Sequence, residues 1–504
     1  MIRSVAILVA IMVVAGWPAA GTPFRGDQVV YVLTAKRMAD GAVLYRDVWD
    51  VTNPGVFWFY QLAGTCFGFT EDGIHLFEWL YWLAFVFTVS YAIKRNDGLA
   101  TLPISPAFFI AGIYYFNSTS DPNQLTRAEG LVGFPLFASI WLACRASIDR
   151  ERTMRLAVLA GMAGGIVILF KLAFGLCVVA AWLAPLVFSI RHRNFFRMLV
   201  GLSIGIVLVL GAAAASFALR GGWNELIDTL FVLPREILSV AEQAEPSRLA
   251  NSIRRFVEVY SPVLAAAVGG GVVALKRRGD PVVVSLILVM VASFAVILIQ
   301  RWSWWDYHFL LLGIPASIIA AWTWPTICLG VRERLGRALT TNERFVSVLV
   351  GIALFLPVFG HGANAHTRIA SHRFGITAEN RTEARNGAGR AYAIAMSETN
   401  WLAGPNELPG PIFVAGDPCF HWVSGRPSAT RFNGWSLELF PERLWNLLWE
   451  ELKANPPAYV FIAHTDEISY AKLIRERAPE MLSWINDFYR EIKRSSNGVW
   501  YRRI

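Results

Sequence analysis

Long apolar segments, separated by short polar turns, recur along most of this 504-residue chain. Hydrophobic residues make up 55% of the sequence and charged residues 16%, whereas a soluble domain carries about 25% charged residues. An apolar segment of roughly 17–25 residues can cross a bilayer as a helix. The pattern therefore predicts a polytopic α-helical membrane protein with about eleven spans. The expected segments are 4–20, 75–93, 100–116, 130–144, 156–170, 172–190, 198–218, 259–275, 281–300, 307–330 and 345–360.

Basic residues gather in five short clusters between these segments, and the clusters give the topology. All five lie on one side if each segment crosses once, and that side is the cytoplasm by the positive-inside rule. The net charge of +9 follows from this arrangement, so we expect membrane lipids and no nucleic acid as partners. The chain is predicted to be a multi-pass inner-membrane protein. The clusters are Lys94–Arg95, Arg145–Arg155, Arg191–Arg197, Lys276–Arg278 and Arg332–Arg344.

The N-terminal apolar run has two readings, a signal peptide or a short first transmembrane helix. Both place the polar segment 21–74 outside the cytoplasm. We therefore expect a transmembrane domain over 1–361 with a large first outer loop at 21–74. The polar tail, 362–504, is expected to be an extracytoplasmic soluble domain.

The tail alternates helical and strand patterns, which is typical of a small α/β domain. Helices are expected at 381–400, 442–453 and 468–485. Continuous apolar runs predict strands at 411–415 and 458–463. Asn497-Gly498, between two further strand patterns, predicts a hairpin.

Two other segments of the expected outer face have an ambiguous pattern. The apolar run 54–69 would reverse the charge topology if it crossed, so it is predicted to be a juxtamembrane or re-entrant helix. The segment 219–258 has helical periodicity that Pro234 is expected to break. It is interpreted either as an interfacial amphipathic helix or as a cover over a substrate groove.

Four aspartates lie within 24 residues of the first outer loop: Asp27, Asp40, Asp47 and Asp50. Asp27 directly follows the first apolar run, where it can act as a general base or simply cap a helix. Asp47 and Asp50 can bind a sugar hydroxyl or a metal, or form a solvated loop balanced by Arg46. The five cysteines show neither a metal-ligand spacing nor a disulfide framework.

Charged residues at the ends of other apolar segments are further candidates. Glu129 either pairs with Arg127 or lies at the mouth of a cavity. Lys171 lies between two apolar runs, where a charge is costly and suggests function, so it either binds a lipid phosphate or extends to the interface. Arg301, Asp306 and His308 are interleaved with aromatic residues, which suits either phosphate binding or an aromatic belt.

The order of these motifs resembles the first outer loop and following spans of bacterial GT-C glycosyltransferases. The relatives in question are the family 39 protein mannosyltransferases and the lipid A aminoarabinose transferase. The resemblance covers about 1–330 and includes an acidic residue after the first span, Gly41-x-x-Leu-Tyr-Arg-Asp47-x-Trp-Asp50, Asn53-Pro-Gly55, Thr126-Arg-Ala-Glu129, the glycine-rich run before Lys171, and Asp306-Tyr-His308.

The resemblance implies a transferase that takes a hexose or pentose from a polyprenyl-phosphate donor on the outer face. The acceptor would be an envelope glycan, lipid or protein. Asp27 would be the catalytic carboxylate in an inverting displacement, with Asp47 the next candidate. Lys171, Arg301 and His308 would hold the donor phosphate, and Asp50, Glu129 and Asp306 complete the set of candidate substrate-binding residues.

One position departs from the family pattern. Many relatives carry a lysine before the proline that follows the acidic loop, and this chain has Asn53. Another cation would then have to bind the phosphate, or the donor or activity would differ. The scheme requires no cofactor, although a divalent cation stays open. A transporter and a non-catalytic membrane binding protein are the alternative functions.

Overall fold

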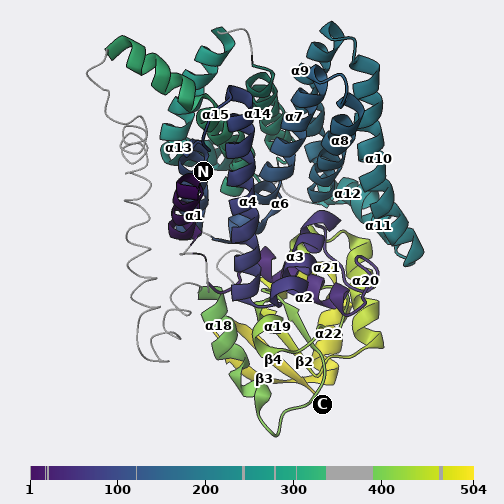
Figure 1. Cartoon of the computed structure of the whole chain (residues 1–504). Coiled ribbons are helices and arrows are strands. Elements are labelled where there is room, and N and C mark those ends of the chain that lie inside the picture. The colour runs from purple at the N-terminus through teal and green to yellow at the C-terminus, as the bar shows by residue number, and fades with distance from the viewer. Residues whose placement is uncertain are drawn as a thin grey trace. The chain divides into compact units, whose positions relative to one another are not determined.

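The computed structural model describes residues 2–16, 19, 22–120, 122–240, 244–276, 280–301, 303–335, 390–464 and 469–504, and most of these residues are helical (Figure 1). The chain packs into two compact units. The helical unit comprises Met1–Gly21, Ile74–Ala214 and Gln243–Ser371. The mixed unit comprises Thr22–Gly73, Ala215–Glu242 and His372–Ile504, and so joins the acidic loop to the tail. The predicted boundary at 361/362 lies outside the described residues.

The helical unit confirms the polytopic architecture. Eight helical stretches among the described residues are long and apolar enough to cross a membrane. They match eight of the expected segments, and the run 345–360 lies outside the described residues. The helices are α1 (Ile2–Gly16), α4 (Glu71–Asp97), α5 (Ser105–Ser120), α6 (Ala128–Leu131), α7 (Gly133–Ile148), α8 (Thr153–Phe170), α9 (Gly175–Arg191), α10 (Phe195–Leu219), α13 (Pro246–Lys276), α14 (Pro281–Ile299) and α15 (Leu310–Leu335).

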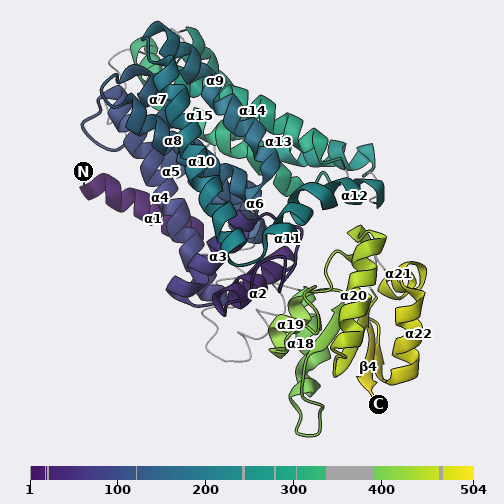
Figure 2. The ribbon, with the colours of Figure 1, turned by 90° about the vertical axis from the view of Figure 1, so that its right-hand side faces the viewer.

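Helices α7, α8, α9 and α14 pack side by side, and α15 lies against α5 and α13 (Figure 2). Small residues allow some of these helices to approach closely, as is common in membranes. A Cβ atom at Gly161 of α8 would lie 2.2 Å from the backbone oxygen of Leu202 in α10. A Cβ atom at Gly205 would lie 2.2 Å from the oxygen of Val158. The two backbones are therefore in contact only because both positions are glycine.

The segment 219–258 differs from its prediction at both proline positions. It contains α11 (Trp223–Ile227), a π-helical stretch over Asp228–Val232, and α12 (Leu233–Val240). Pro234 does not end the helical run, which continues from α11 through the π-helical stretch directly before Leu233 to the end of α12. Helix α13 begins at Pro246 instead of near residue 259, so part of the expected loop is the start of a candidate span.

In the mixed unit, α2 (Asp27–Ala39) packs against α3 (Pro54–Phe67). Tyr31 of α2 makes edge contacts with Phe57 and Tyr60, at ring-centroid distances of 5.7 and 5.5 Å. Helix α3 has 14 residues and is not among the eight candidate spans. Its expected juxtamembrane position remains a prediction.

The tail contains the predicted α/β domain. Its sheet has the order β1-β2-β4-β3, with β1 parallel to β2 and the other pairs antiparallel. The predicted hairpin is β3–β4, and the expected helix 468–485 is divided at Pro479 into α21 and α22. The elements are α18 (Arg390–Thr399), β1 (Ile412–Ala415), α19 (Cys419–Ser424), α20 (Glu442–Ala454), β2 (Tyr459–Ala463), α21 (Tyr470–Arg477), α22 (Pro479–Phe488), β3 (Tyr489–Ser495) and β4 (Gly498–Arg503).

Aromatic side chains form much of the core of this domain. Phe420 of α19 stacks on Phe461 of β2 at 4.5 Å, and Phe461 lies 4.8 Å from Trp500 of β4. These contacts fix α19, and with it the loop that follows β1, on the sheet. The loop 417–432 is therefore partly helical.

Candidate functional site

Asp27 is the first residue of α2, and its carboxylate is held by the tail. The indole Nε1 of Trp435 donates a hydrogen bond of 2.8 Å to Oδ1 of Asp27. Trp435 follows Gly434, which has φ +79°, and a Cβ atom there would lie 1.6 Å from the backbone oxygen of Val414. Only glycine lets this loop cross the end of β1 so closely. The carboxylate is therefore oriented by a contact between residues 408 positions apart.

Two further carboxyl groups interact with Asp27. Burial raises the pKa of Asp50, and the nearby Asp27 carboxylate adds to the effect, while hydrogen bonds from Thr52 and Asn433 oppose it. Burial raises the pKa of Asp417 to about 6, again with a contribution from Asp27. We call Asp27, Asp50 and Asp417 the carboxylate cluster. Charge repulsion at short range favours the protonated form of its less solvated members.

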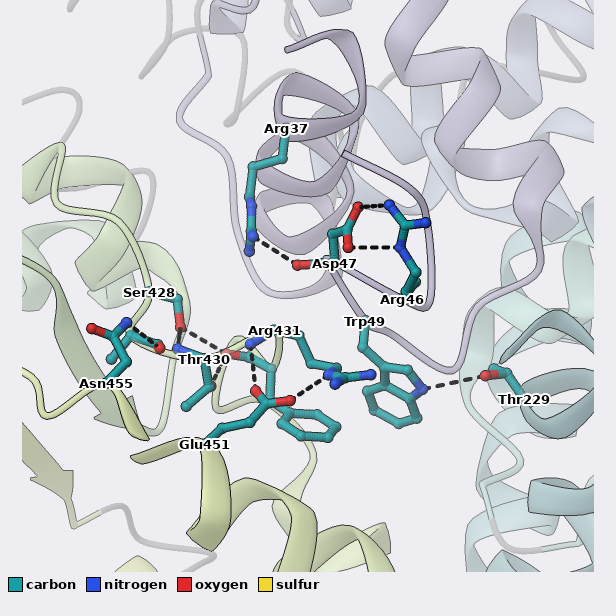
Figure 3. A network of polar contacts seen from close by, with 12 residues as sticks. Arg37, Arg46, Asp47, Trp49, Thr229, Ser428, Thr430, Arg431, Glu451 and Asn455 are labelled. Carbon is teal, nitrogen blue, oxygen red and sulfur yellow. Dashed lines mark hydrogen bonds and ion pairs between the residues drawn. The ribbon is translucent and has the colours of Figure 1, made fainter. Parts of the chain in front are cut away.

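Asp47 has a different environment from Asp27. Its carboxylate accepts two hydrogen bonds of 2.9 Å from Arg46 and one of 2.8 Å from the backbone N–H of Val43 (Figure 3). The Arg46 guanidinium lowers the pKa of Asp47. About a third of the Asp47 side chain is exposed (36%). The Arg46–Asp47 pair matches the interpretation of this segment as a solvated loop balanced by Arg46. Its hydrogen bonds occupy carboxylate lone pairs that a general base needs.

In the helical unit, Lys171 lies at the break between α8 and the next helical turn, as expected. Its Nζ donates to Glu129 Oε1 at 2.9 Å and to Gln300 Oε1 at 2.6 Å. The imidazole Nε2 of His308 lies 3.9 Å from Glu129 Oε1. We call these four residues the lysine cluster. Glu129 is 2% exposed and pairs with Lys171, whereas the sequence analysis had considered Arg127 as its partner.

The other residues near Trp305 are arranged separately. Asp306 accepts a hydrogen bond of 2.7 Å from Ser252 and forms an ion pair of 2.8 Å with Arg255. Arg301 has an exposed side chain, and its backbone oxygen accepts from the N–H of Ala244. Among the described residues, no contact joins the side chain of Asp306 or Arg301 to the lysine cluster. His308 belongs to that cluster.

Asn53, at the position where the family pattern has lysine, precedes the first residue of α3. Its Nδ2 atom is buried, and no hydrogen-bond acceptor for it lies among the described residues. A buried amide donor without a partner costs stability and is often kept for a ligand. Asn53 thus supplies a neutral donor where a cation was expected.

Several residues of these clusters were not among the sequence candidates. Trp435 and Asn433 lie in a tail loop that is far from the carboxylate cluster in the sequence. No local pattern therefore indicates that they are close to it in space. Asp417 lies two residues beyond strand β1, in a loop that the sequence does indicate as a candidate, because loops after strands of α/β sheets commonly form sites. Gln300 directly precedes Arg301, but its side chain is a neutral amide, and the sequence candidates in this segment were selected by charge. Among the described residues, no group of three or more His, Cys, Asp or Glu side chains could hold a metal ion.

A polytopic helical unit, joined to a mixed unit that presents a carboxylate at a helix start, defines the class of fold. The chain shares this fold with a solved membrane protein, ArnT.

The structure of ArnT, an aminoarabinose transferase from Cupriavidus metallidurans, is similar in the apo state with a TM-score of 0.60 and 15% sequence identity. That match covers 99% of this chain and 98% of ArnT. The structure of the same protein bound to undecaprenyl phosphate has a TM-score of 0.59 at 15% identity and covers 100% of this chain and 98% of ArnT. No family model and no curated protein matches the sequence.

Proposed function

We propose that this chain is a membrane glycosyltransferase that takes a hexose or pentose from a polyprenyl-phosphate donor. The acceptor is a hydroxyl or amine of an envelope glycan, lipid or protein on the extracytoplasmic face of the inner membrane. The main support is the fold that the chain shares, over nearly its whole length, with ArnT, which has been solved with bound undecaprenyl phosphate. Proteins that share one fold can catalyse different reactions, so the side chains of the site must supply the chemistry of the transfer.

Asp27 is the proposed general base. The acceptor oxygen or nitrogen attacks the anomeric carbon of the sugar while the bond from that carbon to the phosphate oxygen breaks. Asp27 takes the proton of the acceptor, and the lipid phosphate leaves as a stable anion. The hydrogen bond from Trp435 fixes the position of the Asp27 carboxylate, and a general base must be held within hydrogen-bond reach of the acceptor. A single displacement of this kind inverts the anomeric centre.

Lys171 is the proposed ligand of the donor phosphate. An ammonium group has three N–H donors, and Glu129 and Gln300 take two of them. The third is available to a phosphate oxygen, where a positive charge stabilises the negative charge that develops on the leaving group.

The test is transfer of labelled sugar from a panel of polyprenyl-phosphate sugars to envelope acceptors by the purified protein. Asp27→Asn should lower the rate about 10²- to 10⁴-fold, the range that general-base catalysis supplies. Asp40→Asn is the matched control, because Asp40 is an exposed aspartate at the other end of α2 and should transfer normally. Equal rates for wild type and Asp27→Asn would remove Asp27 from the mechanism. Uptake of substrate without transfer would favour the transporter.

A further inference from the structure

An open cavity of about 320 Å³ lies within the mixed unit, between the C-terminal part of α2 and the tail. This volume is at the lower end of the range for small-molecule sites. Neither the carboxylate cluster nor the lysine cluster contributes to its walls. Its walls include Arg37, Ser428, Thr430, Arg431, Glu451 and Asn455, which Figure 3 shows together.

Arg37 is the cation of this cavity that lacks a carboxylate partner. Its Nη2 donates 2.7 Å to the backbone oxygen of Asp47, and this is its one hydrogen bond among the described residues. A guanidinium has five N–H donors, so several remain. Burial lowers the pKa of Arg37, and the charges of Asp47 and Glu451 only partly offset the effect. The positive charge is therefore poorly solvated and poorly compensated.

The two acidic groups whose charges act on Arg37 already accept hydrogen bonds from other residues. Glu451 accepts from both the backbone N–H, at 2.9 Å, and the Nε of Arg431. Asp47 is held by Arg46, as described above. Counted over Arg37, Arg431 and Glu451, the walls of the cavity carry one positive charge in excess.

The rest of the cavity wall is hydrogen-bonded within itself but leaves one further donor. Ser428 and Thr430 both donate to the backbone oxygen of Phe432, at 2.8 and 2.9 Å. Asn455 donates one amide hydrogen to the oxygen of Ala429 at 2.8 Å. The second amide hydrogen of Asn455 is therefore available in the same cavity as the unused donors of Arg37. Planar donors on a guanidinium suit the two oxygens of a carboxylate or phosphate.

We propose that this cavity binds a sugar oxyanion, either a carboxylate or a phosphate on a carbohydrate, through Arg37 and Asn455. The use of the site follows from the proposed transferase function: it would hold an anionic group of the acceptor. Arg37 lies ten residues beyond Asp27 on the same helix, which is about 15 Å at 1.5 Å per residue. An acceptor anchored there would extend along α2, with its reacting group at Asp27 roughly 15 Å from its charged group.

The test measures binding directly, without donor or transfer. Full-length protein in a neutral detergent is titrated at low salt with glucuronate, glucose 6-phosphate and uncharged glucose, followed by nuclear magnetic resonance. Glucuronate or glucose 6-phosphate should bind, and glucose should not. Tighter binding of one anion identifies the carboxylate or the phosphate as the natural group. Absence of binding by both anions at millimolar concentrations would overturn the proposal.

Substitutions at the cavity wall distinguish an effect of charge on anion binding from an effect of misfolding. Ala454 lines the cavity and is exposed, so Ala454→Glu adds a carboxylate that neutralises Arg37 without removing any native contact. It should weaken anion binding about tenfold or more, the change that one charge-assisted hydrogen bond brings, whereas the uncharged Ala454→Gln should bind normally. Arg37→Gln should weaken binding similarly. Equal affinities for Ala454→Glu and Ala454→Gln would refute the site.

The same variants distinguish this proposal from the proposed function. Asp27→Asn should bind the anionic sugars as wild type does, because Asp27 is not part of the cavity. In transfer assays, Ala454→Glu should raise KM for an anionic acceptor about tenfold and leave kcat unchanged. Binding without any transfer would contradict the transferase function and its acceptor but not the oxyanion site. Transfer without anion binding would contradict the site alone.

Discussion

Asp417 links stability to pH at the level of a single residue. Its pKa in the folded chain is about 6, above the ordinary aspartate value, because of burial and the neighbouring Asp27 charge. The folded state therefore keeps this proton to higher pH than the unfolded state does. The stabilisation is complete below the unfolded pKa near 4 and is lost as pH rises through about 6.

Asp417→Asn should remove this loss and stabilise the protein above pH 6 by on the order of 1–2 kcal/mol. The asparagine oxygen can still accept from the N–H of Cys419, the bond that is 2.9 Å long in the native chain. The midpoint of thermal unfolding, compared between variant and wild type from pH 4 to pH 7, checks this. The difference should widen up to about pH 6 and then stay constant, and a difference independent of pH would contradict the assignment.

Lys171 and Glu129 should behave as a coupled pair. Lys171→Met leaves the buried Glu129 charge without its partner, and loss of one member of such a pair costs about 3–5 kcal/mol. Lys171→Met combined with Glu129→Gln should recover much of the thermal stability, because no charge is then left uncompensated. Transfer should stay lost in the double variant if Lys171 binds the donor phosphate. Wild-type rates in the stable double variant would exclude that role.

At the scale of elements, one side chain joins α20 to the segment that carries α11 and α12. Arg443 donates to Asp228 at 2.9 Å and to Glu236 at 2.6 Å. Two ion pairs on one guanidinium hold the helices together more firmly than an isolated exposed pair. The tail thereby fixes the segment 223–240 within the mixed unit.

Arg443→Gln should speed hydrogen exchange of the backbone amides in 223–240 several-fold, because local opening becomes easier. Lys453→Gln is the control, since Lys453 pairs with Glu450 on the same helix and touches no other element through that pair. Its exchange in 223–240 should match wild type. Unchanged exchange in Arg443→Gln would show that packing alone holds this segment.

At the scale of the whole molecule, the topology derived from the basic clusters can be tested directly. Alkaline phosphatase, which is active only outside the bacterial cytoplasm, should be active when fused after Ile504 and inactive when fused after Asp97. The second position follows Lys94 and Arg95, which the positive-inside rule assigns to the cytoplasm. The reverse pattern would invert the topology and would move the proposed reaction to the other face.

Periodicity and charge were sufficient to predict the helices and strands. Long apolar segments predict spans because a helix in lipid must satisfy its own backbone, and the eight candidate spans confirm this. The strands and hairpin of the tail were predicted from apolar runs and from Asn497-Gly498. The prediction failed where Pro234 was taken as a stop, because the helical run continues through it after a π-helical stretch.

The side-chain partners needed the tertiary structure. Sequence analysis selected Asp27, Glu129, Lys171 and His308 by residue type, but it did not predict that Glu129 pairs with Lys171. Contacts such as Lys171 to Gln300 span 129 positions, and Asp27 to Trp435 spans 408. Nothing local encodes such pairs, because they depend on how whole elements pack.

The sequence by itself determined that this chain crosses a membrane repeatedly and carries a small α/β domain, because hydrophobic length and alternation act locally along the chain. The tertiary structure decided which charges are compensated. It pairs Asp47 with Arg46 and Lys171 with Glu129, and it leaves Arg37 without a carboxylate partner among the described residues. Electrostatic compensation depends on distance in space, and folding alone sets that distance.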